Sequence, residues 1–194
     1  MHLAVFGGTF DPPHNGHLAL ALFARELLAL DRIIISVSNN PFKQDRVAAG
    51  EKHRSRMTEL LAWEINMAGK CCEVSHWELQ KKRTSYTVDL VRHINASYSH
   101  DKLTLLIGED SFAELPSWKE CDALVEMCDI VVFRRCLIDG SFGIFGGDAG
   151  TRMIDFHYPV SSTDIRALVA SEKSVSPLVP PSINSYMRQQ ALYR

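Results

Sequence analysis

Two histidines and two glycines near the N-terminus have the types and spacing expected of a phosphate-binding site. His14 and His17 stand three positions apart in the run GGTFDPPHNGH, which spans residues 7–17. Side chains three apart at a helix start share one face, so both imidazoles can donate hydrogen bonds to the same ligand. Gly7 and Gly8 have no Cβ atoms, which allows a phosphate to approach the backbone closely.

The segments on either side of this run predict a turn between a strand and a helix. Leu3–Phe6 is a short apolar stretch that predicts a buried strand, and Leu18–Leu30 is rich in Ala and Leu and predicts a helix. The first backbone N–H groups of a helix have no intrahelical partners, and with the helix dipole they form an anion site. We therefore interpret the run as a phosphate cradle.

Other interpretations of the run fit less well. It lacks the Gly-Lys-Ser/Thr of a Walker A loop and the spacing G-x-G-x-x-G of a dinucleotide fingerprint. Asp11 and the two histidines could bind zinc, but a zinc site explains neither the glycines nor the strand-to-helix position. A capped turn with two surface histidines stays open as the alternative.

Strand-like and helix-like segments alternate along the 194 residues. The predicted strands are Leu3–Phe6, Ile33–Val37, Cys72–Ser75, Leu103–Ile107, Ile130–Phe133 and Met153–Phe156, and the predicted helices include Leu18–Leu30, Glu51–Met67, Val88–Ala96 and Lys119–Met127. This pattern is typical of an α/β fold with a doubly wound, Rossmann-like parallel sheet and helices on both faces. We expect one domain over residues 1–194, with helices in its last part, from about residue 161.

Candidate ligand-binding residues follow the predicted strands, which is where such sheets bind ligands. After the second strand, Asn40 offers amide groups and Lys43 a positive charge, although a plain polar loop is an equal alternative. Gly108 and Asp110 follow the fourth strand, and Arg134 follows the fifth. The charged residues at the start of the helix Glu51–Met67, among them Arg54, lie near the phosphate end or are simply solvated, and we favour the solvated interpretation.

A second helix start with anion-binding chemistry lies near the C-terminus, in the run VSSTDIR that ends at Arg166. The hydroxyls of Ser162 and Thr163 can cap the first N–H groups, and Arg166 lies one turn from Thr163. A capped helix alone is a weak signal. Two separate helix starts of this type make a stronger one.

Composition narrows the classes of partner. The net charge of −2 gives no indication of a nucleic-acid surface, and the apolar run Leu18–Ala24 is shorter than the about 20 residues of a membrane span. The N-terminus shows no signal-peptide pattern. Five cysteines without a C-x-x-C pair favour neither a disulfide framework nor structural zinc. We therefore expect a cytoplasmic protein without nucleic-acid or membrane partners. The sequence does not indicate its oligomeric state.

The run GGTFDPPHNGH resembles the signature of the HxGH nucleotidyltransferases, which transfer a nucleotidyl group from a triphosphate. It is most similar to the run in bacterial nicotinate mononucleotide adenylyltransferases. Ser85-Tyr86-Thr87, the run IGEDS at 107–111 followed by Trp118, and the run ending at Arg166 match other segments of the family. The resemblance covers nearly the whole chain except 139–151. One histidine that the family often carries just before the lysine at Lys43 is absent.

The resemblance, together with the residue chemistry, implies a set of site residues. His14 and His17 would be catalytic. ATP would be bound by Gly7, Gly8, Thr9, Phe10, His14, His17, Lys43, Gly108, Asp110, Ser162, Thr163 and Arg166. Nicotinate mononucleotide would be bound by Asn40, Thr87, Trp118, Lys119 and Arg134.

The implied reaction joins ATP and nicotinate mononucleotide to give deamido-NAD and pyrophosphate. A phosphate oxygen is the nucleophile and needs no general base, so catalysis rests on positioning and charge stabilisation. Mg²⁺ would be held mainly by the ATP phosphates. If Lys119 begins a helix, its backbone N–H and the helix start at Thr87 could bind the nicotinate carboxylate. The alternatives are a nicotinamide mononucleotide or pantetheine-phosphate adenylyltransferase and a catalytically silent nucleotide sensor.

Overall fold

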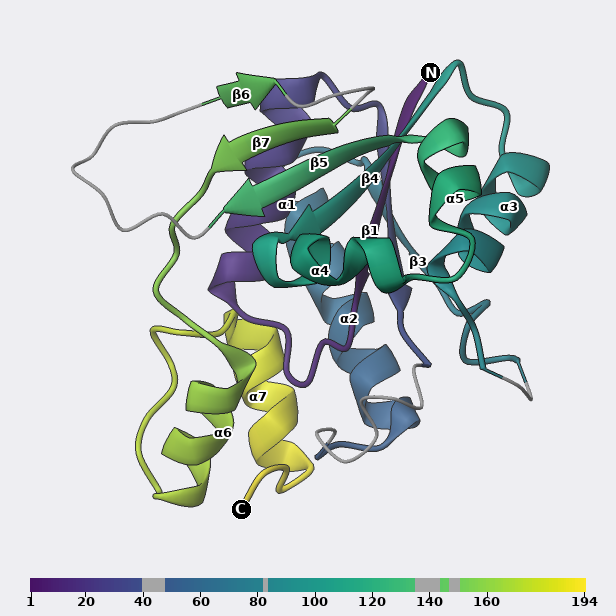
Figure 1. Cartoon of the computed structure of the whole chain (residues 1–194). Coiled ribbons are helices and arrows are strands. Elements are labelled where there is room, and N and C mark those ends of the chain that lie inside the picture. Colours follow the sequence, from purple (N-terminus) through teal and green to yellow (C-terminus); the bar gives the residue numbers. More distant parts are fainter. Residues whose placement is uncertain (40–47, 82–83, 135–143, 147–150) are drawn as a thin grey trace.

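A seven-stranded sheet forms the centre of the molecule (Figure 1). The computed structural model describes residues 1–39, 48–81, 84–134, 144–146 and 151–194. The strands are β1 (His2–Gly8), β2 (Arg32–Val37), β3 (Cys72–Ser75), β4 (Lys102–Gly108), β5 (Asp129–Arg134), β6 (Ile144–Gly146) and β7 (Thr151–Asp155). Their order is β3-β2-β1-β4-β5-β7-β6, and all neighbours are parallel except β6 and β7. The predicted Rossmann-like parallel sheet is confirmed.

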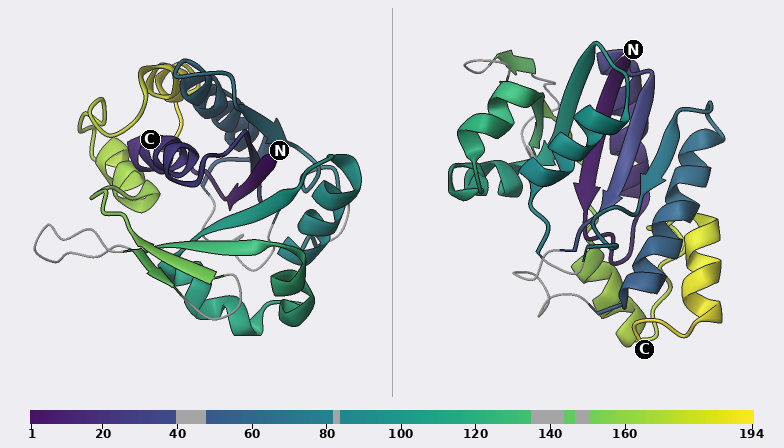
Figure 2. Two further views of the ribbon diagram at one scale, coloured as in Figure 1. Left: turned by 90° about the horizontal axis from the view of Figure 1, so that it is seen from above. Right: turned by 90° about the vertical axis from the view of Figure 1, so that its right-hand side faces the viewer.

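Helices cover both faces of this sheet. They are α1 (Asn15–Leu28), α2 (Glu51–Asn66), α3 (Thr87–Ser97), α4 (Glu109–Glu114), α5 (Cys121–Met127), α6 (Ser162–Ala170) and α7 (Pro181–Gln189), with a short 3₁₀ turn at Leu115–Ser117. Figure 2 shows α6 and α7 on the side of α1 and α2, away from α3 and α5.

The strand residues alternate between two hydrophobic cores because successive side chains point to opposite faces of a sheet. On β1, Ala4 and Phe6 belong to the core under α1, α2, α6 and α7, whereas Leu3 and Val5 belong to the core under α3 and α5. Both faces of β1 are therefore buried, which explains its continuous apolar sequence. A strand packed in this way holds the glycines at its carboxyl end in a fixed place.

Several predicted boundaries need correction. α1 begins at Asn15 rather than Leu18, so that His17 lies in its first turn. α5 begins at Cys121 rather than at Lys119, because Glu120 has a left-handed backbone with φ 52° and the helix cannot extend back through it. The antiparallel strand β6 and the short helix α4 were not predicted. No helix in the described part of the chain is long and apolar enough to cross a membrane.

Candidate active site

The carboxyl ends of β1 and β4 face an open cavity. The strand order changes direction between these two strands, and ligands of open α/β sheets bind at such a point. Gly7 is the last but one residue of β1 and Gly108 ends β4, and a Cβ atom placed on either would meet nothing within 4 Å. Both glycines line a cavity of about 210 Å³, together with His14 and His17. The sequence therefore leaves space at the place where a ligand can approach the backbone.

The two histidines lie on one wall of this cavity. Their rings stack with centroids 3.7 Å apart and planes inclined by 30°. The backbone N–H of His14 donates to Nδ1 of His17 at 3.1 Å, as in a capping box at the start of α1. An accepting Nδ1 carries no hydrogen, so Nε2 of His17 carries the ring hydrogen and is the donor of this imidazole.

Protein groups already use several donors at the start of α1. The N–H of Asn15 donates to the carbonyl of Leu178 at 2.9 Å, and its side-chain amide donates to the carbonyl of Pro177 at 2.9 Å. The N–H of His17 bonds to the carbonyl of His14 at 2.9 Å. The N–H groups of Asn15 and His17 therefore have protein acceptors, and the two imidazoles are the groups at this helix start that line the cavity.

Tight packing fixes the loop that leads to these histidines. A Cβ atom on Gly8 would lie 2.8 Å from the ring of Phe10, and one on Gly16 would lie 3.0 Å from the ring of His14. The ring of Phe10 is buried, and its centroid lies 5.2 Å from that of His17. Phe10 thus shapes the loop with its side chain, so any contact with ATP would come from its backbone.

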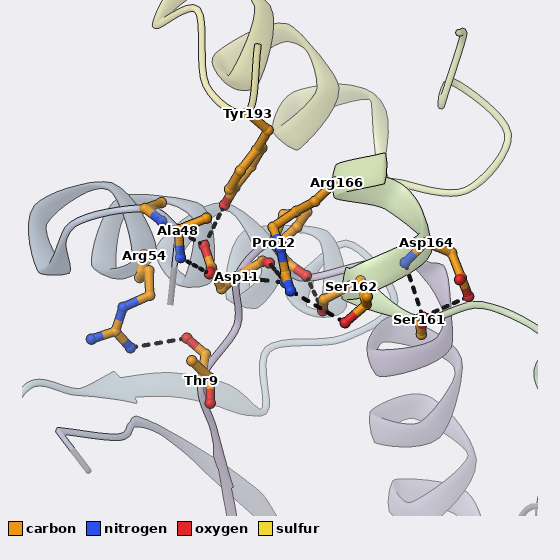
Figure 3. A network of polar contacts seen from close by, with 12 residues as sticks. Thr9, Asp11, Pro12, Ala48, Arg54, Ser161, Ser162, Asp164, Arg166 and Tyr193 are labelled. Carbon is orange, nitrogen blue, oxygen red and sulfur yellow. Dashed lines mark hydrogen bonds and ion pairs between the residues drawn. The ribbon is translucent and has the colours of Figure 1, made fainter. Parts of the chain in front are cut away.

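The second predicted helix start docks directly onto this loop (Figure 3). The Ser162 hydroxyl donates to the carbonyl of Pro12 at 2.8 Å, and Nη1 of Arg166 donates to the carbonyl of Asp11 at 2.7 Å. Nη2 of Arg166 donates to the Thr163 hydroxyl at 3.2 Å. A guanidinium has more N–H donors than these contacts use, so Arg166 can also bind an anion. The structure thus joins the two predicted anion motifs.

The Asp11 carboxylate is occupied by protein groups. It accepts hydrogen bonds from the backbone N–H groups of Ala48 and Ala49 at 2.6 and 3.0 Å and from the Tyr193 hydroxyl at 2.7 Å. The side chain of Asp11 is only 3% exposed, and Nη1 of Arg166 lies 3.9 Å from its Oδ2. Asp11 therefore organises the loop and is poorly suited to bind zinc or accept a proton.

Arg54 contradicts the expectation of a solvated side chain. It is buried, and its Nη1 donates to the carbonyls of Thr9 and Ser38, each at 3.0 Å. Burial lowers the pKa of its guanidinium, an effect that the nearby Asp11 carboxylate opposes. Arg54 thus ties α2 to the loops that follow β1 and β2. No sequence motif marks it, and a position on the inner face of α2 was the only available signal.

The residues predicted to bind the mononucleotide fall into three groups. Thr87 begins α3, and Lys119 lies beside that helix start, with its Nζ 3.5 Å from Asp89 and 4.8 Å from the ring centroid of Tyr86. Trp118 precedes Lys119 and is half-buried against the core under α3 and α5. Thr87 and Lys119 are thus brought together, although the Lys119 N–H does not begin a helix.

Arg134 is the second group, and Asn40, which follows β2 together with the predicted ATP ligand Lys43, is the third. Arg134 ends β5 as predicted, and its guanidinium forms an ion pair with Asp155 on β7, with Nη2 2.7 Å from Oδ1. Asn40 and Lys43 lie outside the described residues.

Some cavity residues were predicted as site residues and others were missed because they carry no motif. Asp110, which was predicted to bind ATP, lies at the start of α4 and lines the cavity. Phe133, Phe156, Tyr158 and Val160, from the ends of β5 and β7 and the chain beyond, also line it. Within the described ranges, no group of three or more His, Cys, Asp or Glu side chains is placed to hold a metal ion.

Comparisons with known proteins show which proteins the chain resembles. A model of the cytidylyltransferase-like family matches residues 5–168. A protein of Pelodictyon phaeoclathratiforme, named "Probable nicotinate-nucleotide adenylyltransferase", is 53% identical over 197 residues, which cover 100% of this chain and 92% of that protein. A protein of Chlorobium limicola with the same name is 51% identical and covers 100% of this chain and 99% of that protein.

Solved structures show the same fold at low identity. The Plasmodium falciparum nicotinic acid mononucleotide adenylyltransferase complexed with NaAD superposes with a TM-score of 0.76 at 17% identity, covering 99% of this chain and 97% of that one. The same protein complexed with APC gives a TM-score of 0.72, covering 99% and 96% of the two chains.

Proposed function

The chain belongs to the cytidylyltransferase-like family and, within it, to the nicotinate-nucleotide adenylyltransferases, and on that premise we propose that it transfers the adenylyl group of ATP to nicotinate mononucleotide. The products are deamido-NAD and pyrophosphate, in NAD biosynthesis. The observation that supports this most is the union of two anion-binding helix starts beside one cavity. Ser162 and Arg166 of α6 bond to the backbone of the loop that carries His14 and His17.

In this proposal the imidazoles bind the α-phosphate of ATP. The Nε2–H group of His17 would be a neutral donor to the negative charge that develops on the α-phosphate, and the His14 ring stacks on the His17 ring. The attacking group is a phosphate oxygen of the mononucleotide, which is already ionised near neutral pH. No general base is required, which fits an Asp11 carboxylate that is fully occupied. The chain supplies position and charge stabilisation, and no covalent enzyme intermediate forms.

ATP would lie across the ends of β1 and β4. Gly7 and Gly108 leave room for its sugar and phosphates, whereas Gly8 is packed against Phe10 and could contribute only backbone groups. Asp110 on the cavity wall can accept from a sugar hydroxyl. Arg166 and Thr163 would bind the outer phosphates, with Lys43 as a second cation. Ser162 uses its hydroxyl on Pro12 and can offer only its backbone N–H. Thr9 and Phe10 would contribute backbone groups.

Nucleotidyltransferases of this kind generally use a divalent metal, and we propose that the ion is Mg²⁺ and enters with ATP. Mg²⁺ is commonly held by substrate phosphates with one or two carboxylates, and it would neutralise the leaving pyrophosphate.

Nicotinate mononucleotide would bind beside the start of α3. The N–H groups of Thr87 and of the next residue begin this 11-residue helix and can donate to the pyridine carboxylate. Trp118 would stack on the ring, and Lys119, beside the same helix start, adds positive potential. Arg134 and Asn40 remain candidates for the phosphate and ribose. This arrangement favours an acid over a neutral amide.

We also propose a compartment for the protein and the extent of its catalytic domain. Four described cysteines are free, namely Cys71, Cys72, Cys121 and Cys128, which supports a reducing cytoplasm. We treat residues 1–194 as one catalytic domain whose last helices carry the second phosphate motif, because α6 and α7 pack on the same core as α1 and α2. ATP and nicotinate mononucleotide are its small-molecule partners.

A turnover assay with ATP and each of three acceptors tests the proposal. We expect deamido-NAD from nicotinate mononucleotide, less product from nicotinamide mononucleotide and none from pantetheine phosphate. Equal or greater turnover with either alternative acceptor would reassign the substrate. Binding of ATP without product from any acceptor would favour a nucleotide sensor.

A further inference from the structure

The segment that follows α7 folds back and places a tyrosine against the loop between β1 and α1. Leu192 N donates to the carbonyl of Met187 at 3.0 Å, and Tyr193 has a left-handed backbone with φ 65°. The Tyr193 hydroxyl then donates to Oδ1 of Asp11 at 2.7 Å, across 182 positions of the sequence. Figure 3 shows the Tyr193 ring descending toward the Asp11 carboxylate between α6 and α2. This contact uses no residue of either phosphate motif except Asp11.

The Asp11 carboxylate depends on all of its partners because it is removed from water. Its side chain is 3% exposed, and a buried carboxylate is costly unless its oxygens accept hydrogen bonds. Tyr193 and Ala49 bond to Oδ1, and Ala48 bonds to Oδ2. Burial, and next the hydrogen bond to Asp11, raises the pKa of Tyr193, so its hydroxyl stays protonated and remains a donor. The Tyr193 hydroxyl therefore remains a donor at pH values where an exposed tyrosine would ionise.

The backbone of Asp11 carries this constraint to the groups that meet the triphosphate. Nη1 of Arg166 donates to the Asp11 carbonyl at 2.7 Å and lies 3.9 Å from the Asp11 carboxylate. Ser162 donates to the carbonyl of the next residue, Pro12. A shift of Asp11 thus moves the two acceptors that hold the start of α6. Tyr193 is one of the groups that prevent such a shift.

We propose that Tyr193 is a positioning residue for ATP, which acts through Asp11 to hold Arg166 and the start of α6 in the orientation that binds the triphosphate. Tyr193 itself touches no substrate. The inference rests on the proposed function, because it assumes that Arg166 meets ATP. It adds Tyr193, which follows α7, to the residues that position the site.

A purely structural role for Tyr193 is the competing explanation, and the chain offers a matched control. Tyr186 on α7 is also half-buried and packs on the same core as Tyr193. Its hydroxyl lies 3.0 Å from Nδ1 of His53, and no hydrogen bond connects it to Asp11. Tyr186→Phe and Tyr193→Phe each remove one hydroxyl and keep the ring, and Tyr193→Phe should cost more stability because its hydroxyl bonds to a buried carboxylate. ATP affinity, and not stability, therefore separates the two explanations.

The test measures ATP binding separately from turnover. Titration calorimetry with α,β-methylene ATP, in the absence of nicotinate mononucleotide, gives Kd for the wild type and both variants. Steady-state assays give kcat and the two KM values. For Tyr193→Phe we expect Kd and the ATP KM to rise about threefold to tenfold, the scale of one hydrogen bond. Its kcat and mononucleotide KM, and all constants of Tyr186→Phe, should stay near wild type.

Each contrary result has a distinct meaning. Equal ATP affinities for Tyr193→Phe and Tyr186→Phe would overturn the positioning role, whatever their melting temperatures. In an Asp11→Ala background, which removes the oxygen that accepts the Tyr193 hydroxyl, Tyr193→Phe should weaken ATP binding no further, and an undiminished effect there would show that Tyr193 does not act through Asp11. A wild-type protein that fails to bind the ATP analogue would overturn the proposed function and this inference with it.

Discussion

His17 performs two tasks with its two ring nitrogens, and substitutions can separate them. Nδ1 accepts the backbone N–H of His14 at 3.1 Å, and Nε2 carries the hydrogen proposed to meet the α-phosphate. His17→Asn places an acceptor near the position of Nδ1 but reaches no farther. His17→Gln places an amide N–H near the position of Nε2 but lacks the nearer acceptor. His17→Ala removes both groups.

The two tasks have different magnitudes. Loss of one preorganised donor to a developing negative charge lowers kcat by about 10²–10³. Loss of one backbone hydrogen bond at the helix start lowers the free energy of unfolding by about 1 kcal/mol. We therefore expect His17→Asn to lose the rate but keep most of the stability. His17→Gln should recover on the order of tenfold in kcat over His17→Ala, because it retains one neutral donor near the phosphate.

Single-turnover rates at saturating ATP, with urea unfolding of the same preparations, give both quantities. Single-turnover conditions isolate the chemical step from product release. Equal kcat for His17→Asn and the wild type would remove Nε2 from the mechanism. Equal rates for the Gln and Ala variants would show that an imidazole is needed for more than one donated hydrogen bond.

Three further predictions concern the triphosphate, the pyridine and a buried carboxyl. Arg166→Ala should clearly raise the ATP KM. Arg166→Lys should restore it only partly, because lysine keeps the charge but loses the planar fork of the guanidinium. Unchanged ATP kinetics in both variants would refute the role of Arg166 in binding the triphosphate. The kcat/KM for nicotinate mononucleotide should exceed that for the nicotinamide form at least about tenfold, the scale of a hydrogen bond to a charged group, and Trp118→Ala should weaken both. Burial raises the pKa of Glu78 above its ordinary value of 4.5, an effect opposed by the bond from Ser36 Oγ at 2.7 Å. The folded state then binds the Glu78 proton more tightly than the unfolded state does, so wild-type stability should fall as pH rises above 4.5. Urea unfolding of the wild type and of Glu78→Gln at several pH values measures this fall. Stabilities of the two proteins that run parallel with pH would contradict the prediction.

The parts of the fold that follow from local pattern were predictable from the sequence. The strands β1, β2, β4 and β5 are short apolar runs buried on both faces, and their alternation with helices predicts the sheet. Gly7 and Gly108 follow apolar runs in the sequence and lie near the carboxyl ends of β1 and β4. A side chain at either position would meet no neighbouring atom within 4 Å, so packing does not require glycine there. These features depend on residues close together in the chain.

The parts that were missed depend on single backbone states and distant contacts. Glu120 adopts a left-handed backbone that no composition predicts, and it moves the start of α5 past Lys119. Arg54 looks solvated in sequence but is buried against two backbone carbonyls. The bond from Tyr193 to Asp11 joins segments 182 positions apart and belongs to no motif. Such contacts become visible only when the chain is folded.

Transfer of label from [α-³²P]ATP tests the central claim, direct adenylyl transfer to a mononucleotide phosphate, most directly. Under single-turnover conditions with nicotinate mononucleotide, we expect all transferred label in deamido-NAD. Without the acceptor, neither labelled protein nor labelled AMP should form, because the nucleophile belongs to the mononucleotide. Label on the protein before the acceptor is added, or label that never reaches deamido-NAD, would contradict the account.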